Sequence, residues 1–317
     1  MFQAETVYVK HIHSTLKCVD FAKECTVEIT NRGIRFGVDE SQSLQAHLFI
    51  DKALFQKYNF EDDEENYSYL FKTRLAPLLQ CLSIYTDGKE KQVASPWDQQ
   101  PSTNTMHKRG VVCKIHFEGI GAPFEWEVEE MAGYSTICEL STLDYEENID
   151  VSRLATTLNT KVIMRSGWLY DALLELDNNM SESLMIETSS QRSTFLLRCV
   201  GGMSTTEMEY PNEKNVLESF ETNSEYTYTY RFSLIRQAIK ALQAGTKVSL
   251  RIDENGTLNI QLMLVGQDGL CTFVDFRIAP LDLMSEDEDD DEENLANNGY
   301  MENYNDQENY NTEEEDD

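Results

Sequence analysis

Long apolar runs, paired cysteines and basic residues are all scarce in this chain of 317 residues. No stretch approaches the ~18 consecutive apolar residues of a membrane-spanning helix, and the first residues lack the charged and apolar regions of a secretory signal. The seven cysteines are scattered and form no C-x-x-C pair, which argues against a disulfide framework and against a structural zinc site. We therefore expect reduced core cysteines in a cytosolic or nuclear protein without membrane contact.

The common motifs of catalysis are missing as well. The sequence holds no G-x-x-x-x-G-K-[ST], G-x-G-x-x-G, G-x-S-x-G or H-E-x-x-H. His11 and His13 lie two residues apart without a third ligand at a useful spacing, so the surface of a helix is a better interpretation than a metal site. We expect no enzyme activity, cofactor or metal. The alternative is a metal-dependent 3'-5' DNA exonuclease, in which paired carboxylates such as those of residues 62–65 hold two ions.

Acidic residues outnumber basic ones: the chain has 57 Asp and Glu and 26 Lys and Arg, which gives a formal net charge of −31. Residues 281–317 hold 17 of the acids and no base, and their low complexity predicts a disordered acidic tail. The preceding residues still carry 40 acids against 26 bases, so a role on nucleic acid requires a locally basic surface. A histone-chaperone-like binding protein, in which the tail binds the partners, is a further alternative.

The two halves of the chain share a pattern. Two segments of the first half match segments of the second at one offset of 159 residues, and a third pair matches at 136: Cys25–Gly33 with Leu184–Arg192, Tyr67–Leu75 with Tyr226–Leu234, and Val111–Ile115 with Lys247–Arg251. A polar, proline-marked loop at residues 86–109 accounts for the change of offset. The pattern predicts a duplicated domain, although identity between the halves is low.

Each half reads as a helix, several strands, a second helix and three more strands. Apolar residues recur at helical spacing in four segments: Val9–Phe21, Leu75–Ile84, Ser166–Asp177 and Ser233–Gln243. The remainder alternates with period two and is punctuated by hairpin turns. The prediction is an α+β protein with mostly antiparallel sheets. Its expected parts are a first domain at 1–140, a connector at 141–158, a second domain at 159–280 and the tail at 281–317.

Positive charge gathers near the predicted helices. Residues 231–247 contain four bases and no acid, and bases next to an apolar stripe can contact phosphates without reading sequence. A solvated helix face is the alternative explanation. Asp171 and Glu175 make the third helix an exception. The candidates for phosphate contact are Lys10, Lys17, Lys72, Arg74, Arg231, Arg236, Lys240 and Lys247.

Three stretches carry a resemblance to a known family. Cys25–Ile50, Leu75–Ile84 and Leu250–Met263 resemble the Rad-one subunits of the checkpoint sliding clamp, and the similarity covers about residues 1–280. The resemblance implies a fold like that of proliferating cell nuclear antigen (PCNA), in which helices line a central hole and strands form the outer wall. It implies a ring around duplex DNA, closed with one Rad-nine-type and one Hus-one-type subunit.

The resemblance also implies interfaces. Subunits of such rings join through edge strands, expected here at Tyr134–Leu140 and Met203–Glu209, with Tyr134, Ile137, Leu140, Met203, Thr205 and Met208 as contact residues. Partner peptides of related clamps dock beside the connector, where Leu140, Leu143 and Tyr145 are candidate apolar contacts. An equal alternative is that these three residues merely tie the connector down.

The family resemblance finally implies a function without chemistry of its own. A loader resembling replication factor C would open the ring, and the closed ring would recruit checkpoint and repair proteins in the nucleus, including during meiosis. The third helix departs from this pattern, because its acids weaken the expectation of close DNA contact in that quarter of the subunit.

Overall fold

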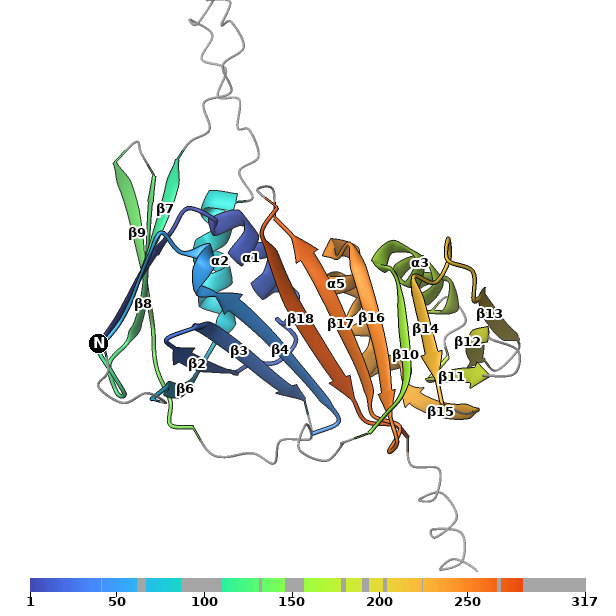
Figure 1. Cartoon of the computed structure of the whole chain (residues 1–317). Helices are drawn as coiled ribbons and strands as arrows, with labels where there is room; N and C mark the ends of the chain where they lie inside the picture. The colour runs from blue at the N-terminus through green and yellow to red at the C-terminus, as the bar shows by residue number, and fades with distance from the viewer. Residues whose placement is uncertain are drawn as a thin grey trace, which may run out of the picture. The chain divides into compact units, whose positions relative to one another are not determined.

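The computed structural model describes most of the chain up to residue 281. The described residues are 1–40, 42–61, 67–86, 110–130, 133–145, 157–177, 181–189, 194–201, 204–223, 225–266 and 269–281 (Figure 1). The loop predicted at 86–109 and the acidic tail therefore lie almost wholly outside the described residues. Residues 1–280 form one compact unit, and residues 281–317 are grouped as a second. Within the described part, no helix is both long and apolar enough to cross a membrane.

Among its described residues, the first unit contains eighteen strands and five α-helices, together with a 3-10 turn at Lys52–Leu54. The first half contains β1 (Phe2–Thr6), α1 (Val9–Lys17), β2 (Cys25–Thr30), β3 (Gly33–Glu40), β4 (Leu44–Asp51), β5 (Lys57–Phe60), β6 (Tyr69–Thr73), α2 (Leu75–Thr86), β7 (Val111–Phe117), β8 (Phe124–Glu130) and β9 (Tyr134–Leu140). The second half contains β10 (Leu158–Arg165), α3 (Ser166–Asp177), β11 (Ser183–Ser189), β12 (Thr194–Val200), β13 (Thr205–Pro211), β14 (Ser219–Thr222), β15 (Tyr226–Arg231), α4 (Phe232–Arg236), α5 (Ile239–Ala244), β16 (Lys247–Asp253), β17 (Leu258–Val265) and β18 (Cys271–Ile278).

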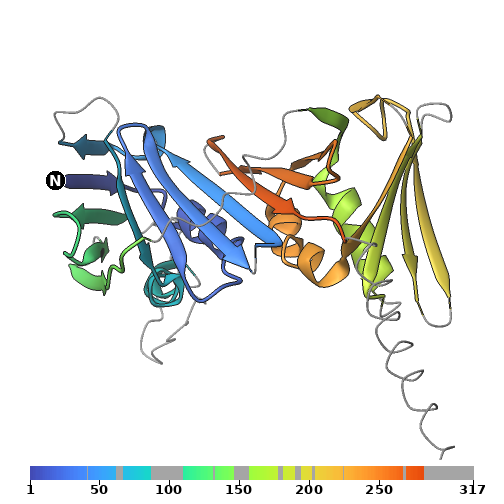
Figure 2. The same cartoon turned by 90° about the horizontal axis from the view of Figure 1, so that it is seen from below.

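The strands form three sheets in which the neighbours are antiparallel. One sheet has the order β5-β1-β7-β8-β9, the central one β14-β10-β16-β17-β18-β4-β3-β2-β6, and the third β13-β12-β11-β15. The central sheet joins the two halves of the chain, because β18 from the second half pairs with β4 from the first. Figure 2 shows the first and third sheets at the two ends of this unit. The predicted α+β class with antiparallel sheets is confirmed.

The element order of the first half repeats in the second, as the sequence pattern predicts. Each half has a strand, a helix, five strands, a helical segment and three strands. At the offset of 159 the inward faces also agree: Val27 in β2 and Ile186 in β11 are both buried. The alternation is imposed by the pleat, which sends successive side chains to opposite faces of a sheet. The pairing of segments therefore reflects a structural duplication.

The third matched pair is wrong by one residue. It falls on the equivalent strands β7 and β16, but Cys113 and Ile115 are buried, whereas Ser249 and Arg251, 136 positions later, face away from the core. A slip of one residue along a strand sends every side chain to the other face. The strands are equivalent, and the residue-by-residue match at this offset is not.

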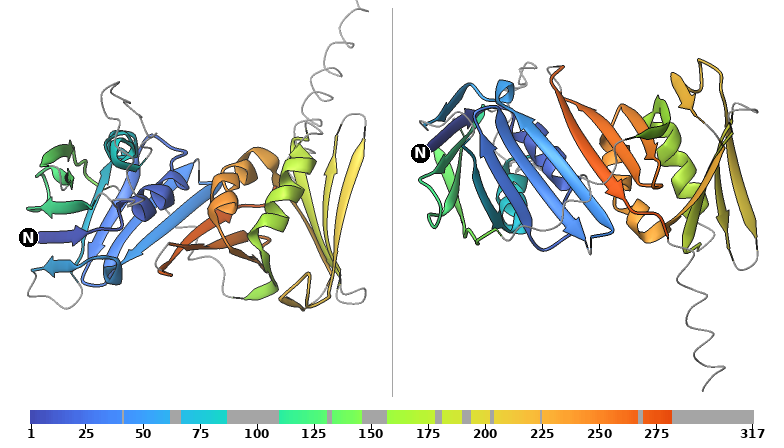
Figure 3. Two further views of the ribbon diagram at one scale, coloured as in Figure 1. Left: turned by 90° about the horizontal axis from the view of Figure 1, so that it is seen from above. Right: turned by 60° about the horizontal axis from the view of Figure 1, so that its bottom comes forward.

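The helices follow one another in the order α2, α1, α5, α3 (Figure 3). In sequence, α3 has the predicted bounds, α2 ends two residues later than predicted, and α1 ends four residues earlier. The single helix predicted at Ser233–Gln243 is instead divided into α4 and α5. The amides of Gln237 and Ala238 donate to carbonyls three residues back, a tighter turn that separates the two pieces.

The core is apolar and well filled. In the first half, Phe71 of β6 and Phe124 of β8 meet edge-on across the junction of two sheets, and Phe124 also meets Trp126 of its own strand edge-on. Such pairs add about 0.5–1.5 kcal/mol beyond the burial of their area. All seven cysteines are free thiols, and five of them are buried. The expected core position is confirmed for those five, but Cys138 is only half-buried, and the expectation is wrong for Cys271, which is exposed.

Candidate nucleic-acid and partner interfaces

A basic surface lies on the two central helices of the row. Lys10, Ser14 and Lys17 are exposed along one side of α1, while Val9, Ile12 and Leu16 on the opposite side are buried. The exposed Lys240 of α5 lies close enough to influence the thiol of Cys18, which follows α1. The structure therefore brings Lys10, Lys17 and Lys240 together on neighbouring helices.

Cys18 illustrates the balance of burial and charge at this contact. Burial raises the pKa of its thiol to about 12, and the nearby Lys240 ammonium opposes the rise. Burial dominates, because removing a thiolate from water costs more than one partly screened cation returns. Cys18 is therefore a protonated packing residue, and the charge available at the surface is that of the lysines.

The other predicted bases of the second half are placed differently. Arg236 binds Asp177 at the end of α3, with 2.6 Å between Nη2 and Oδ1 and 2.7 Å between Nε and Oδ1. Its guanidinium also lies 5.0 Å from the centre of the Phe232 ring. Arg231 precedes α4 and is exposed, as is Arg74 just before α2. Arg236 thus has a structural partner, and much of its charge is offset inside the subunit.

Two predicted bases do not lie on the helix-lined side. Lys72 belongs to β6, and its ammonium stands 6.0 Å from the centre of the Tyr145 ring, beside the connector. Lys247 belongs to β16, where Val248 and Leu250 face the core, and it binds Glu218 at 2.7 Å. Because alternate residues of a strand face opposite sides, Lys247 points away from the helices. The assignment of Lys72 and Lys247 to the helix-lined surface is wrong.

The outer helices of the row contribute little positive charge. The segment that forms α2 contains no charged residue, and α3 exposes Asp171 and Glu175. Among the described helices, the basic surface therefore rests on the lysines of α1 and α5, while Arg231 is the last residue of β15 and follows the buried Tyr230. The exception noted for the third helix holds in the structure.

Both predicted edge strands lie at the edge of a sheet. β9 borders only β8, and β13 borders only β12, within the part of the chain that the structure describes. On β9, Tyr134 is 73% and Ile137 56% exposed. On β13, Thr205 is exposed and Met208 half-buried against the core, while Met203 lies outside the described residues. These two edges leave backbone donors and acceptors open to another strand.

Leu140 is wrong as an interface residue and as a connector contact. It is only 3% exposed and pairs with Phe124 at the inner end of β9. Its side chain belongs to the core of the first half. The alternative that such residues tie the chain down therefore applies to Leu140.

The joint inside the subunit shows how two such edges meet. β18 and β4 pair antiparallel from Phe273 opposite Phe49 to Ile278 opposite Leu44. By element order β18 is the counterpart of β9, and β4 is the counterpart of β13. β9 and β13 are thus edges of the same kinds as the two that already pair.

The start of the connector is fixed to the first half and borders a pocket. The amides and carbonyls of Lys72 and Leu143 exchange hydrogen bonds of 2.9 and 2.8 Å, and the Thr73 hydroxyl donates to the carbonyl of Ser141. The pocket has a volume of about 370 Å³. It is lined by Leu70, Phe71, Ile120, Gly121, Thr142, Leu143, Asp144 and Tyr145.

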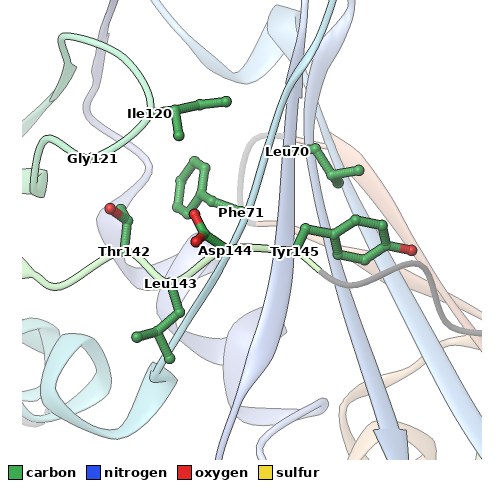
Figure 4. Close-up of a pocket in the computed structure, with 8 residues that line it drawn as sticks. All are labelled: Leu70, Phe71, Ile120, Gly121, Thr142, Leu143, Asp144 and Tyr145. Atoms are coloured by element: carbon green, nitrogen blue, oxygen red, sulfur yellow. The ribbon is translucent and has the colours of Figure 1, made fainter.

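The pocket combines apolar and acidic character. Figure 4 shows the Tyr145 ring beside Leu70, and the Asp144 carboxylate beside the ring of Phe71. Leu143 and Ile120 are 43% and 65% exposed. The structure thus brings together two of the three predicted connector residues, and it adds Ile120, which sequence reasoning missed. Residues 146–156 of the connector lie outside the described residues.

The histidines of α1 are packing residues. His11 Nε2 lies 2.7 Å from the Thr272 hydroxyl of β18, and burial lowers the pKa of its ring. His13 is 2% exposed and forms a hydrogen bond with Thr86. Both histidines lie on a helix, as predicted. The prediction that they lie on its surface is wrong for His13, which is buried. Across the described residues, no group of three or more His, Cys, Asp or Glu could hold a metal ion. The predicted carboxylates of residues 62–65 lie outside the described residues.

Comparison with solved structures defines the class. A PCNA from Thermococcus kodakaraensis is similar with a TM-score of 0.67 and 15% identity, over 89% of this chain and all of that one. The PCNA2–PCNA3 complex from Sulfolobus tokodaii gives 0.66 and 15% over 88% of this chain and 98% of the matched one. At such identities the similarity shows the fold alone. The fold is that of a PCNA-like clamp, built from a duplicated domain.

Sequence comparison identifies the family within this class. The model of the family described as repair protein Rad1/Rec1/Rad17 matches residues 1–264, and the chain belongs to this family. It is 70% identical to the DNA damage checkpoint control protein rad1 of Schizosaccharomyces pombe, over 91% of this chain and 89% of that protein. It is 30% identical to the human cell cycle checkpoint protein RAD1, over 88% of this chain and 92% of that protein.

Proposed function

We propose that this chain is a non-catalytic subunit of a heterotrimeric checkpoint clamp that encircles DNA at sites of damage. One observation carries the proposal: a clamp-fold subunit of the Rad1 family leaves open two sheet edges whose counterparts already pair with each other inside the subunit. Edges of this kind invite a neighbour on each side. A ring completed by one Rad-nine-type and one Hus-one-type subunit would satisfy both.

The basic surface on α1 and α5 supports the DNA part of the proposal. Lysines that face phosphates release counterions and bind without regard to sequence. Lys10, Lys17 and Lys240 supply such charges in a chain whose total is strongly negative. Because a closed ring is held by its topology, each phosphate contact needs to contribute little affinity. The lysines therefore hold the ring on the duplex while allowing it to slide.

The connector pocket supports the recruitment part. An apolar cavity with exposed Ile120 and Leu143 and one carboxylate suits a short segment of a checkpoint or repair protein. A loader resembling replication factor C would open the ring and place it on DNA. The site of action would be the nucleus, in dividing and in meiotic cells. Damage signalling would then follow from what the ring recruits.

The experiment that tests the proposal is purification of the tagged full-length chain under native conditions. We expect two unlike clamp subunits of similar size in equal amounts. The purified complex, loaded on nicked circular DNA, should be retained, and it should be lost when a restriction enzyme linearises the circle, since a ring slides off an open end. A linear DNA blocked at both ends serves as the matched control and should retain the complex.

Two results would overturn the proposal. A chain that is recovered only as a monomer, or only with unrelated partners, would contradict the heterotrimer. A complex that dissociates equally from circular, blocked and open DNA would contradict encirclement. Mg²⁺-dependent degradation that disappears when particular carboxylates are substituted would instead support the exonuclease.

A further inference from the structure

The edges formed by β9 and β13 carry charge of the same sign. On the outward face next to β9, the acids Glu125, Glu127 and Glu129 of β8 alternate with buried residues, and Glu139 of β9 lies directly opposite Glu125. Lys114 of β7 contacts Glu129 at 2.9 Å and Glu127 at 3.5 Å, and His116 of β7 lies opposite Glu125. Two of the four carboxylates therefore share the Lys114 ammonium, and acids outnumber bases among the described residues next to β9.

The edge formed by β13 is acidic as well. Glu207 and Glu209 are exposed on its outward face. Arg198 of β12 lies between Glu207, at 2.7 Å, and Glu187 of β11, at 3.9 Å. Two carboxylates thus share the Arg198 guanidinium, and Glu209 adds a third acid to this face. The turn that follows adds Glu213 and Lys214, one charge of each sign, and leaves the balance unchanged.

The joint inside the subunit is built differently. Across β18 and β4, Asp275 is opposite His47, and its carboxylate is influenced by Arg277, Arg251 and Arg35. One acid is therefore surrounded by bases where the two edges meet. The attraction of these bases offsets part of the cost of burying the Asp275 charge, whereas like charges directly opposite one another across paired strands destabilise the pairing.

Transferred to two copies of this chain, the same geometry brings acid against acid. In the internal joint the end of β18 meets the start of β4. A joint between copies would place the end of β9, with Glu139, against the start of β13, with Glu207 two residues further on. Glu125 and Glu209 would add to the repulsion from the neighbouring positions. The backbone edges fit this pairing, and their side-chain charges oppose it.

We infer that the two acidic edges select neighbours with basic edge strands and prevent the chain from closing a ring with copies of itself. The inference rests on the proposed function and adds the chemistry of the partners: each neighbouring subunit presents lysine or arginine beside the strand that pairs with β9 or β13. Like-charge exclusion of wrong partners is the repulsive half of specificity.

The test uses a second copy of the chain as the probe. In the variant Glu125→Lys with Glu139→Lys, the β9 edge becomes basic while the β13 edge stays acidic. We expect this variant to self-associate at least about tenfold more tightly than the wild type in sedimentation velocity at low salt, and added salt should weaken the association. Glu24→Lys with Glu254→Lys changes the net charge equally at exposed sites outside both edges and should leave self-association at the wild-type level.

A reciprocal variant distinguishes charge complementarity from nonspecific association caused by the substitutions themselves. Adding Glu207→Gln and Glu209→Lys to the first variant makes both edges basic and should return the chain to a monomer. Circular dichroism of each variant verifies that it is folded. For the wild type, salt should strengthen the weak self-association, because screening reduces repulsion.

The inference is overturned if the folded basic-edge variant stays monomeric at all salt concentrations, if the control pair associates equally, or if the wild type already forms tight oligomers through these edges. The first two results do not bear on the recovery of two unlike partners or on retention by circular DNA, and for the third, native purification shows independently whether two unlike subunits are still recovered. Failure of the charge inference is therefore distinguishable from failure of the clamp proposal.

Discussion

Lys72 and Leu143 exchange two backbone hydrogen bonds, of 2.9 and 2.8 Å, and so join the start of the connector to the edge of the central sheet. The bridge occupies the outer side of β6, so this edge is covered by the chain itself. The Lys72 side chain then lies over Tyr145 rather than over the helices. The contact fixes one wall of the pocket and removes Lys72 from the surface proposed to contact DNA.

Substitution of the helix lysines should weaken the contact of the assembled clamp with DNA. With Lys10, Lys17 and Lys240 all changed to Ala, the slope of log K against log salt should fall by up to about 3, because each lost phosphate contact removes close to one released counterion. Fluorescence anisotropy with duplex DNA at several salt concentrations measures the slope. Lys72→Ala with Lys247→Ala is the matched control and should leave it unchanged. An equal loss from the control pair would contradict the placement of the basic surface on α1 and α5.

Two glycines with the same backbone conformation should respond differently to alanine. Gly256 and Gly269 have φ of +79° and +78°, but a Cβ at Gly256 would stand 2.5 Å from the Tyr228 ring, whereas none of the described atoms lies within 4 Å of one at Gly269. Gly269→Ala should cost about 1 kcal/mol for the left-handed backbone alone. Gly256→Ala should cost about 1–3 kcal/mol more for the displaced ring. Urea unfolding measures both, and equal costs would show that the ring moves aside freely.

The architecture could be predicted because it follows from local patterns. A strand's alternation with period two, or a helix's apolar stripe, can be recognised within one short segment of the sequence. Turns marked by glycine and asparagine show where one such segment ends and the next begins. α3 has the predicted bounds, Ser166 and Asp177, and its apolar stripe from Leu169 to Leu176 lies within them. The duplication was readable because the buried positions of β2 and β11 recur at one spacing.

The placement of individual charges could not be predicted in the same way. Arg236 is held by Asp177, 59 residues earlier in the chain, and no local pattern encodes that contact. Lys72 stands three residues before a helix and belongs to a strand, so only the sheet decides which way it points. Ile120 lines the pocket from a turn between β7 and β8. Such sites arise from tertiary contacts between distant segments.

The stability of the central joint should depend on the ionisation of Asp275. Burial raises the pKa of this carboxyl above its usual value of 3.8, against the opposing effect of the nearby arginines. A raised folded-state pKa stabilises the protein below the unfolded pKa, and this contribution is lost as pH rises through the folded pKa. Asp275→Asn should therefore raise the melting temperature at pH 7, and the difference should shrink toward about pH 3, where the wild-type carboxyl is protonated in both states. Differential scanning calorimetry across this range checks it. A melting temperature difference that does not change with pH would contradict a cost of burying the charge.

Substitutions of Leu140 and Ile137, three residues apart on β9, should distinguish a side chain that stabilises the fold from one that contacts the neighbouring subunit. Leu140 is 3% exposed and packs in the core, so Leu140→Ala should lower the free energy of unfolding by about 2–5 kcal/mol through lost burial and a residual cavity. Ile137 is 56% exposed, and Ile137→Ala should change the free energy of unfolding by no more than about 0.5 kcal/mol. The same Ile137 variant should nevertheless recover less of the neighbouring subunit in native purification, because the exposed side chain would be buried only when a second strand pairs with β9. Urea unfolding of the isolated chain and quantification of the purified complex give the two readouts. If Ile137→Ala destabilises the chain as much as Leu140→Ala and leaves recovery unchanged, then the side chain serves the fold, and β9 is not the strand through which the subunit meets its neighbour.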